Sequence, residues 1–380
     1  VRLPAATSEV LFHAFLPSGP RPATGYPVVV FGHGLNDSQW GAPSLVASTL
    51  ARAGFATVAI NAMGHGSGPR SVLRLALTNG TTLEFPAGGR SVDRNGDGAI
   101  ESAEGCLVAE PAPTGLRDCL RQTVLDLMQL VRVLRAGVDL DGDGTVDLDR
   151  DRIYYAGQSL GALYGTVLVG LEPGIRAAVL NAGGGTVMDI ARWSPDFRGF
   201  PREFLASRTP PLLNRGRDYD ESYVLRNRPA KVVETPGAIE IQNLFETVEW
   251  LQVAGDPLAY AGQGKAPVLW QFARGDRTVP NPQTSALIRA AGGRPMVQLY
   301  RHDVARAVYA DLGSNPHTYL VDVRSVAGAA IALAVQGQMA EFFQANGTLV
   351  PGVNSFQLRI LFGGRSLFES PEGLPEDLGF

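Results

Sequence analysis

The sequence predicts an α/β fold in which helices cover both faces of a mainly parallel sheet. The runs 26–34 (YPVVVFGHG) and 55–66 (FATVAINAMGHG) are rich in apolar and β-branched residues and end in glycines. Such runs are typical of strands that are buried on both faces. Between them, 44–54 has helical spacing and ends in a glycine, so strands and helices alternate along the chain.

The same alternation continues towards the C-terminus. The segment 116–135 is predicted to be a helix because its apolar residues recur at steps of three and four, on one face: Leu116, Leu120, Val124, Leu127, Val131 and Leu134. The other expected elements are strands at 9–18, 153–158, 175–183, 266–276 and 295–300, and helices near 281–293 and over 321–345.

Two insertions interrupt this pattern. Residues 67–115 are rich in Gly, Pro and Asp, and residues 186–264 contain many aromatic side chains without strand alternation. We therefore expect one domain over 1–348 that carries both insertions, the second one partly helical. Residues 349–380 are expected to be an appendage packed on the outside.

Composition excludes several classes of protein. The net charge is −4 and the basic residues form no blocks, so a nucleic-acid partner is not expected. No run of 18 or more apolar residues predicts a membrane span, and 326–335 is better interpreted as a buried helix. The first ten residues lack a signal-peptide pattern, which predicts a cytosolic or an already processed chain. Oligomeric state is not indicated.

Cys106 and Cys119 are the two cysteines of the chain. In an oxidising compartment they could close one short loop, but two buried thiols have the same spacing. Sequence separation permits a bridge without establishing its geometry, so both states remain open.

The segment 157–161 (GQSLG) matches the pattern G-x-S-x-G between an expected strand and an expected helix. This context predicts a sharp turn that presents Ser159 as a nucleophile. The alternative is a serine that serves only as a small turn residue or as a helix N-cap.

A serine nucleophile needs a base to accept its proton and a carboxylate to orient that base. Asp276 follows the expected strand 266–276, at the place where such a carboxylate belongs. Downstream of Ser159 the histidines are His302 and His317. We favour His317, because its loop before the last helix can reach over the carboxyl edge of the sheet, and interpret His302 as a strand-end residue with a satisfied hydrogen bond.

An oxyanion would need preorganised backbone donors. The N–H of Leu160, directly after the nucleophile, is one candidate, and the N–H of Leu35 in the glycine-rich segment 31–40 is the other, with Gly34 next. His33 is expected to brace this segment, and His65 is interpreted as structural as well.

The order GHG, GQSLG, GDRTVP and a late NPH resembles the α/β-hydrolase superfamily, and within it serine esterases and lipases, including secreted bacterial members with embedded calcium-binding loops. The resemblance covers roughly residues 9–345. It implies an eight-stranded, mostly parallel sheet and a triad of Ser159, Asp276 and His317. It also implies that the insertion 186–264 is a cap or lid.

Two acidic loops fit the calcium-loop pattern D-x-[DN]-x-[DN]-G. The first, 93–104, would bind through Asp93, Asn95, Asp97, the carbonyl of Ala99, and Glu104. The second, 139–150, offers Asp139, Asp141, Asp143 and Asp147, but has Arg150 where a glutamate is expected, so that Asp149 or Asp151 would have to substitute. Either loop can also be an Asp/Gly turn that needs no metal.

Acyl transfer at an oxyanion hole requires no Lewis acid, so no cofactor is expected for catalysis. Calcium in these loops is instead expected to stiffen the scaffold. Calcium loops together with a possible disulfide favour a secreted or periplasmic location.

The sequence therefore predicts a serine-dependent carboxylic ester hydrolase that acts on a small-molecule or polymeric ester through an acyl-enzyme. The aromatic residues of 186–264, together with Trp40, suggest apolar acyl chains or polyester segments as substrates. Two alternatives remain: a serine peptidase of the same fold, and a non-catalytic calcium-dependent binding module.

Overall fold

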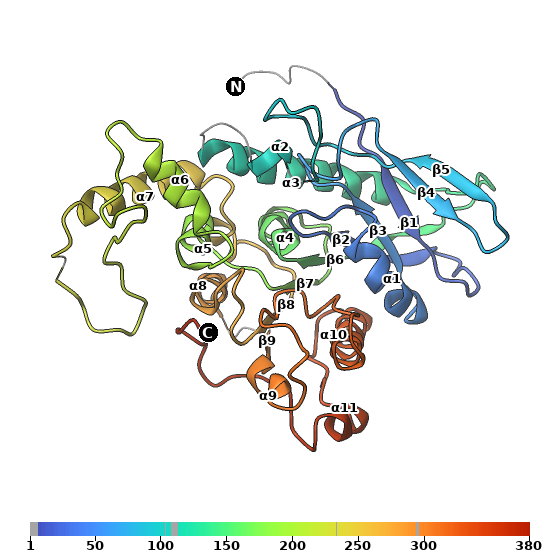
Figure 1. Cartoon of the computed structure of the whole chain (residues 1–380). Coiled ribbons are helices and arrows are strands. Elements are labelled where there is room, and N and C mark those ends of the chain that lie inside the picture. Colours follow the sequence, from blue (N-terminus) through green and yellow to red (C-terminus); the bar gives the residue numbers. More distant parts are fainter. Residues whose placement is uncertain (1–6, 103, 108–112, 233, 294–295) are drawn as a thin grey trace.

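A computed structural model of the chain describes residues 7–102, 104–107, 113–232, 234–293 and 296–380. Its centre is an eight-stranded sheet with the order β1-β3-β2-β6-β7-β8-β9-β10 (Figure 1). The inner strands run parallel, whereas β1 and β10 join the two edges antiparallel. The strands are β1 (Phe12–Phe15), β2 (Tyr26–Gly32), β3 (Ala56–Ile60), β6 (Leu148–Gln158), β7 (Ala178–Asn181), β8 (Val268–Ala273), β9 (Met296–Tyr300) and β10 (Phe368–Glu369).

Helices cover both faces of this sheet, as the uniformly apolar strands predict. Val28 and Val30 of β2 belong to one buried core, and Val29 and Phe31 belong to the other. The first core also contains side chains of α3, α4 and α8, and the second contains side chains of α1, α10 and α11. The helices outside the insertion that follows β7 are α1 (Ala42–Arg52), α2 (Glu104–Leu107), α3 (Pro113–Ala136), α4 (Leu160–Leu171), α8 (Asn281–Ala291), α9 (His302–Arg306), α10 (Val326–Gln344) and α11 (Phe356–Leu361).

Helix α3 shows how well the periodic pattern predicts burial. It extends the expected 116–135 by a turn at its start, and its predicted apolar face lies against the sheet. Leu116 is only partly buried, while the other side chains of that face are buried: Leu120, Val124, Leu127, Val131 and Leu134.

The insertion after β3 forms a separate hairpin and the short helix α2, which a disulfide links to α3. Strands β4 (Val72–Ala76) and β5 (Thr82–Pro86) make a two-stranded sheet of their own. Cys106 in α2 and Cys119 in α3 form a disulfide. The structure thus decides between the two states of the cysteines that the sequence leaves open.

The insertion after β7 contains α5 (Val187–Trp193), α6 (Gly199–Ala206), α7 (Ala238–Gln252) and the short 3-10 helix η1 (Pro257–Ala259). Figure 1 shows α5, α6 and α7 grouped together at one end of the molecule. We call residues 186–264 the cap. It has a small hydrophobic core of its own, made of Met188, Leu205, Tyr219, Ile241, Phe245 and Val248.

The C-terminal residues differ from the outside appendage that the sequence predicts. Leu358, Phe362 and Phe368 are buried in the same core as α1 and α10. Phe368 of β10 pairs with Tyr300 of β9, so this segment completes the sheet at its edge. The reason is that β9 would otherwise leave an unpaired edge, which folded proteins commonly cover.

Helix α10 is, among the described residues, the one helix long and apolar enough to cross a membrane by length and composition alone. In the fold it packs against the sheet, and 61% of its apolar 18-residue stretch is buried inside the protein. It is thus a core helix in this structure, as expected for 326–335.

Candidate active site

Ser159 lies on a sharp turn between β6 and α4, at the carboxyl edge of the sheet. Its backbone has φ 56° and ψ −121°, in a region that a residue with a side chain rarely adopts. Two glycines make this turn possible. A Cβ on Gly157 would lie 2.2 Å from the carbonyl oxygen of Gly161, and one on Gly161 would lie 2.0 Å from that of Gly32. The glycine spacing of GQSLG is therefore a steric requirement of the turn.

The structure brings Ser159, His317 and Asp276 together. His317 Nε2 is 2.7 Å from Ser159 Oγ, and His317 Nδ1 is 2.8 Å from Asp276 Oδ2. All three residues are buried, with 7%, 7% and 1% exposure for Ser159, His317 and Asp276. The carboxylate makes Nδ1 the protonated nitrogen, so Nε2 is free to accept the serine proton. This is the hydrogen-bonded chain that an activated serine needs.

Asp276 is held by its own loop after β8. Its Oδ1 accepts the backbone N–H groups of Thr278 and Val279, each at 2.9 Å. The other oxygen is thereby directed at the imidazole of His317. His302 lies elsewhere: its Nε2 contacts the carbonyl oxygen of Gly313 at 2.8 Å. The sequence-based preference for His317 over His302 agrees with this arrangement.

The glycine-rich segment after β2 passes beside the serine. A Cβ on Gly34 would lie 3.4 Å from Ser159 Cβ, so the backbone next to Leu35 is close to the nucleophile. Leu160 is the first residue of α4, and an N–H at this position has no acceptor within its own helix. Both backbone segments that were expected to offer oxyanion donors, at Leu35 and Leu160, thus lie next to Ser159.

His33 braces this segment, as expected. Its Nδ1 donates to the carbonyl oxygen of Gly34 at 2.8 Å, and its Nε2 accepts the N–H of Ala62 at 2.9 Å. Burial lowers the pKa of His33 to about 4, so the ring is neutral at neutral pH and can make both hydrogen bonds. His65, whose pKa is lowered to about 4 mainly by burial, lies beside it with the ring centroids 5.5 Å apart.

No protein-family model matches this chain, and no curated protein matches its sequence. Solved structures do match. An acylaminoacyl peptidase from Pyrococcus horikoshii has a TM-score of 0.50 at 15% identity, over 95% of this chain and 43% of the peptidase. The chain has the α/β-hydrolase fold.

Two further solved structures match with lower TM-scores. An acetyl xylan esterase from Paenibacillus sp. R4 has a TM-score of 0.48 at 16% identity, over 77% of this chain and 73% of the esterase. A monoacylglycerol lipase from Paleococcus ferrophilus has a TM-score of 0.43 at 16% identity, over 89% of this chain and all of the lipase.

The aromatic residues of the cap, and Trp40 outside it, occupy different kinds of position in this fold. Phe245 is fully buried in the cap's own core, edge-on to Tyr219, and Trp250 is 74% exposed on its surface. Trp40 stacks on His13 with ring centroids 4.0 Å apart. These side chains therefore serve packing or surface positions, and an aromatic-rich sequence does not by itself establish an aromatic-lined substrate pocket.

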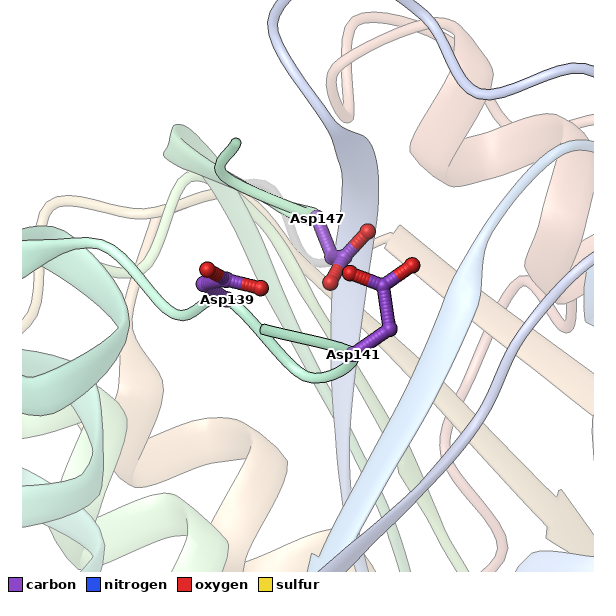
Figure 2. A group of neighbouring side chains, drawn as sticks. All are labelled: Asp139, Asp141 and Asp147. Atoms are coloured by element: carbon purple, nitrogen blue, oxygen red, sulfur yellow. The ribbon is translucent and has the colours of Figure 1, made fainter. Parts of the chain in front are cut away.

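The second acidic loop gathers three carboxylates (Figure 2). The ligand oxygens of Asp139, Asp141 and Asp147 lie within 4.8 Å of one another, which is compatible with one Ca²⁺ that binds oxygens at about 2.3–2.6 Å. Asp143, the fourth side chain expected here, pairs with Arg21 at 2.9 Å, and the same guanidinium contacts Asp147.

Asp147 accounts for the missing glutamate at the end of this loop. In the first loop, Glu104 accepts the two backbone N–H groups that follow Asp93, at 2.7 and 3.0 Å. In the second loop, Asp147 accepts the N–H of Leu140 at 2.7 Å, and this hydrogen bond lowers its pKa. Asp149 accepts backbone N–H groups further along β6 instead. The carboxylate of Asp147, three positions before the place where the calcium-loop pattern has its glutamate, thus makes the hydrogen bond across the second loop that Glu104 makes across the first.

The first loop is held by hydrogen bonds of its own. Asp93 accepts the N–H groups of Gly96 and Gly98, at 2.7 and 3.0 Å. Within the described part of the chain, three carboxylates come close enough for one metal in the second loop and not in the first. The residues that the sequence selects in the first loop are Asp93, Asn95, Asp97, Ala99 and Glu104.

Sequence reasoning missed two residues that hold the histidine loop. Asn315 Oδ1 accepts the N–H of His317 at 3.2 Å, and Gln158 Nε2 donates to the carbonyl oxygen of His317 at 3.3 Å. The Asn-Pro dipeptide at 315–316 is a turn signal that could have drawn attention to Asn315. Nothing in the local sequence marks Gln158 as a partner of a residue so far along the chain.

Proposed function

We propose that this protein is a serine hydrolase that cleaves carboxylic esters through an acyl-enzyme. The observation that carries the proposal is the chain of hydrogen bonds from Asp276 through His317 to Ser159, on a strained turn at the carboxyl edge of an α/β-hydrolase sheet. A binding protein has no need for a buried serine whose hydroxyl faces an oriented imidazole.

In the first half-reaction, Ser159 Oγ attacks the ester carbonyl carbon while its proton passes to His317 Nε2. The tetrahedral intermediate carries a negative oxygen, and the N–H groups of Leu160 and Leu35 are the proposed donors to it. His317 then gives the proton to the leaving alcohol oxygen, and the acyl group remains on the serine. Asp276 keeps its charge throughout and stabilises the imidazolium that forms.

In the second half-reaction, water replaces the alcohol. His317 accepts a proton from the water, the resulting hydroxide attacks the acyl carbonyl, and the same backbone donors stabilise the second oxyanion. Collapse of this intermediate releases the carboxylic acid, and His317 returns the proton to Ser159 Oγ.

The proposal is tested with a fluorophosphonate probe, which modifies activated serines covalently. The native protein is labelled, digested and mapped, and we expect the modification on the peptide that contains Ser159. Ser159→Ala is the control and should not label. Asp276→Asn should keep the fold but label about 10⁴-fold more slowly, because an uncharged partner favours the wrong imidazole tautomer. A native protein that does not label would refute the proposal.

A serine peptidase is the second candidate. The solved structure with the highest TM-score among those compared above is an acylaminoacyl peptidase, although that likeness concerns the fold. A matched pair of substrates, an alkyl ester and the anilide of the same acyl group, separates the two functions. We expect turnover of the ester and little or none of the anilide, and faster anilide turnover would favour the peptidase.

A preference for apolar acyl chains is a further part of the proposal. Support comes from Trp193 and Phe197 of the cap, which are only partly buried and so are not confined to its core. A series of p-nitrophenyl esters of increasing acyl length tests it. Preference for acetate and loss of activity on longer acyl groups would contradict an apolar acyl pocket.

We propose that calcium binds in the second acidic loop through Asp139, Asp141 and Asp147 and stiffens the segment that leads into β6. The first loop would contribute a second site only after its carboxylates approach one another. The disulfide between Cys106 and Cys119 supports an oxidising, secreted or periplasmic location, where calcium is abundant. A calcium-dependent binding module without catalysis remains the outcome if Ser159 does not label.

A further inference from the structure

A cluster of polar side chains joins three segments of the chain beside the triad. Asn315 comes from the loop before α10, Thr278 from the loop after β8, and Asp196 from the cap segment after α5. Asn315 Nδ2 donates to Thr278 Oγ1 at 2.9 Å and to Asp196 Oδ2 at 3.1 Å. Thr278 Oγ1 donates to the same carboxylate oxygen at 2.5 Å. The three side chains therefore satisfy one another in a closed triangle.

The other end of the Asn315 side chain reaches the catalytic loops. Its Oδ1 accepts the backbone N–H of His317 at 3.2 Å and that of Arg277 at 3.1 Å. Arg277 follows Asp276 directly. One amide group thus fixes the distance between the backbone of the base and the backbone of the carboxylate that orients it.

The cap is attached to this point by two contacts. Asp196 receives the hydrogen bonds of Asn315 and Thr278, and Ser194 Oγ donates to the carbonyl oxygen of Arg277 at 2.8 Å. Thr278 also donates its backbone N–H to Asp276 Oδ1. A displacement of cap residues 194–196 would therefore also displace the loops that carry Asp276 and His317.

We propose that Asn315 is a positioning residue that holds His317 against Ser159, and that the cap controls this alignment through Asp196. The inference rests on the proposed serine-hydrolase function and adds a regulatory contact to it. The carboxylate of Asp196 accepts from Asn315 and Thr278, so it would act on His317 through these two residues.

The first variant is Asn315→Asp, because an aspartate side chain has nearly the same shape as an asparagine side chain. It keeps an acceptor for the two N–H groups but replaces the donor with a carboxylate that faces Asp196. The second variant is Asp196→Asn, whose amide oxygen can still accept from Asn315 and Thr278. The double variant Asn315→Asp/Asp196→Asn reverses donor and acceptor and keeps the total charge of the native pair. Glu246→Gln, at an exposed carboxylate on cap helix α7, is the control.

The main measurement is the rate constant for labelling of Ser159 by a small fluorophosphonate, with the melting temperature measured for each variant. We expect Asn315→Asp to label about 10- to 100-fold more slowly, because sub-ångström displacement of a base is costly, while Asp196→Asn and Glu246→Gln stay close to the native rate. The double variant should recover most of the lost rate. With p-nitrophenyl acetate, kcat should fall more than KM rises in Asn315→Asp.

The outcomes test separately the proposed function, the positioning role of Asn315 and the role of the cap. If the native protein does not label, the proposed function fails before this inference is tested. If it labels and Asn315→Asp labels equally fast, Asn315 does not position the base. If Asn315→Asp is slow and the reversed pair is equally slow, the contact with the cap is not what matters. If Asn315→Asp does not fold, Asp196→Ala is the deciding variant. We expect it to label about 3- to 10-fold more slowly than the native protein, a modest effect because the lost hydrogen bonds are partly exposed. Labelling at the native rate would overturn the role of the cap.

Discussion

Replacing Gly161 with alanine tests how the turn at the nucleophile positions the neighbouring oxyanion segment. A Cβ at 161 would lie 2.0 Å from the carbonyl oxygen of Gly32 and 3.0 Å from that of His33. To reach an ordinary contact of 3.4 Å, the segment after β2 must move by about 1.4 Å, which is 3.4 minus 2.0. That segment leads directly to Leu35, so the proposed oxyanion donor moves with it.

A displacement of this size is expected to slow acylation about 100-fold and to cost about 1–3 kcal/mol of unfolding free energy. Labelling of Ser159 by a fluorophosphonate measures the first effect, and urea denaturation measures the second. Gly337→Ala is a matched control, because Gly337 also lies within a helix and an added Cβ there would meet no atom within 4 Å apart from its own neighbouring helix backbone. It should stabilise the protein by about 0.5–1 kcal/mol and leave labelling unchanged.

The result that refutes this reasoning is a Gly161→Ala protein that folds and labels as fast as the native one. It would mean that α4 can move away instead of the oxyanion segment, or that this segment carries no donor. Slow labelling in both glycine variants would point to a general loss of stability and would equally contradict the specific role of Gly161.

Three further predictions concern stability. Cys106→Ser/Cys119→Ser should lower the unfolding free energy by about 3 kcal/mol, because the bridge restricts the unfolded chain, and an unchanged urea midpoint would contradict this. Burial lowers the pKa of His33 and His65 to about 4, so the unfolded chain binds more protons and stability falls as pH drops from 6.5 towards 4. Each histidine changes the unfolding free energy by at most about 1.4 kcal/mol per pH unit. His33→Asn should therefore make the plot of unfolding free energy against pH less steep. An unaltered slope would contradict a buried neutral ring at His33. Calcium should raise the melting temperature of the native protein more than that of Asp141→Asn, and no calcium effect on either would remove the proposed site.

Much of the fold could be predicted because its signals are local. Strands buried on both faces are uniformly apolar, as in β2, and the apolar face of α3 follows a helical period. The nucleophile could be predicted for the same reason, since the strand, the glycine-flanked turn and the helix around Ser159 are contiguous in sequence. The pairing of β10 with β9 could not, because two residues contain no periodic signal.

The sequence by itself thus determined the alternation of the main strands and helices, the turn at Ser159 and a short set of candidate partners for it. Only the tertiary structure decided that His317 reaches the serine, that Asp147 closes the second acidic loop, and that Asn315 ties the histidine loop to Asp196 of the cap. The physical reason is that these are hydrogen bonds between groups whose separation depends on how distant segments pack. Spacing along the chain limits such contacts, but the folded backbone sets their distances.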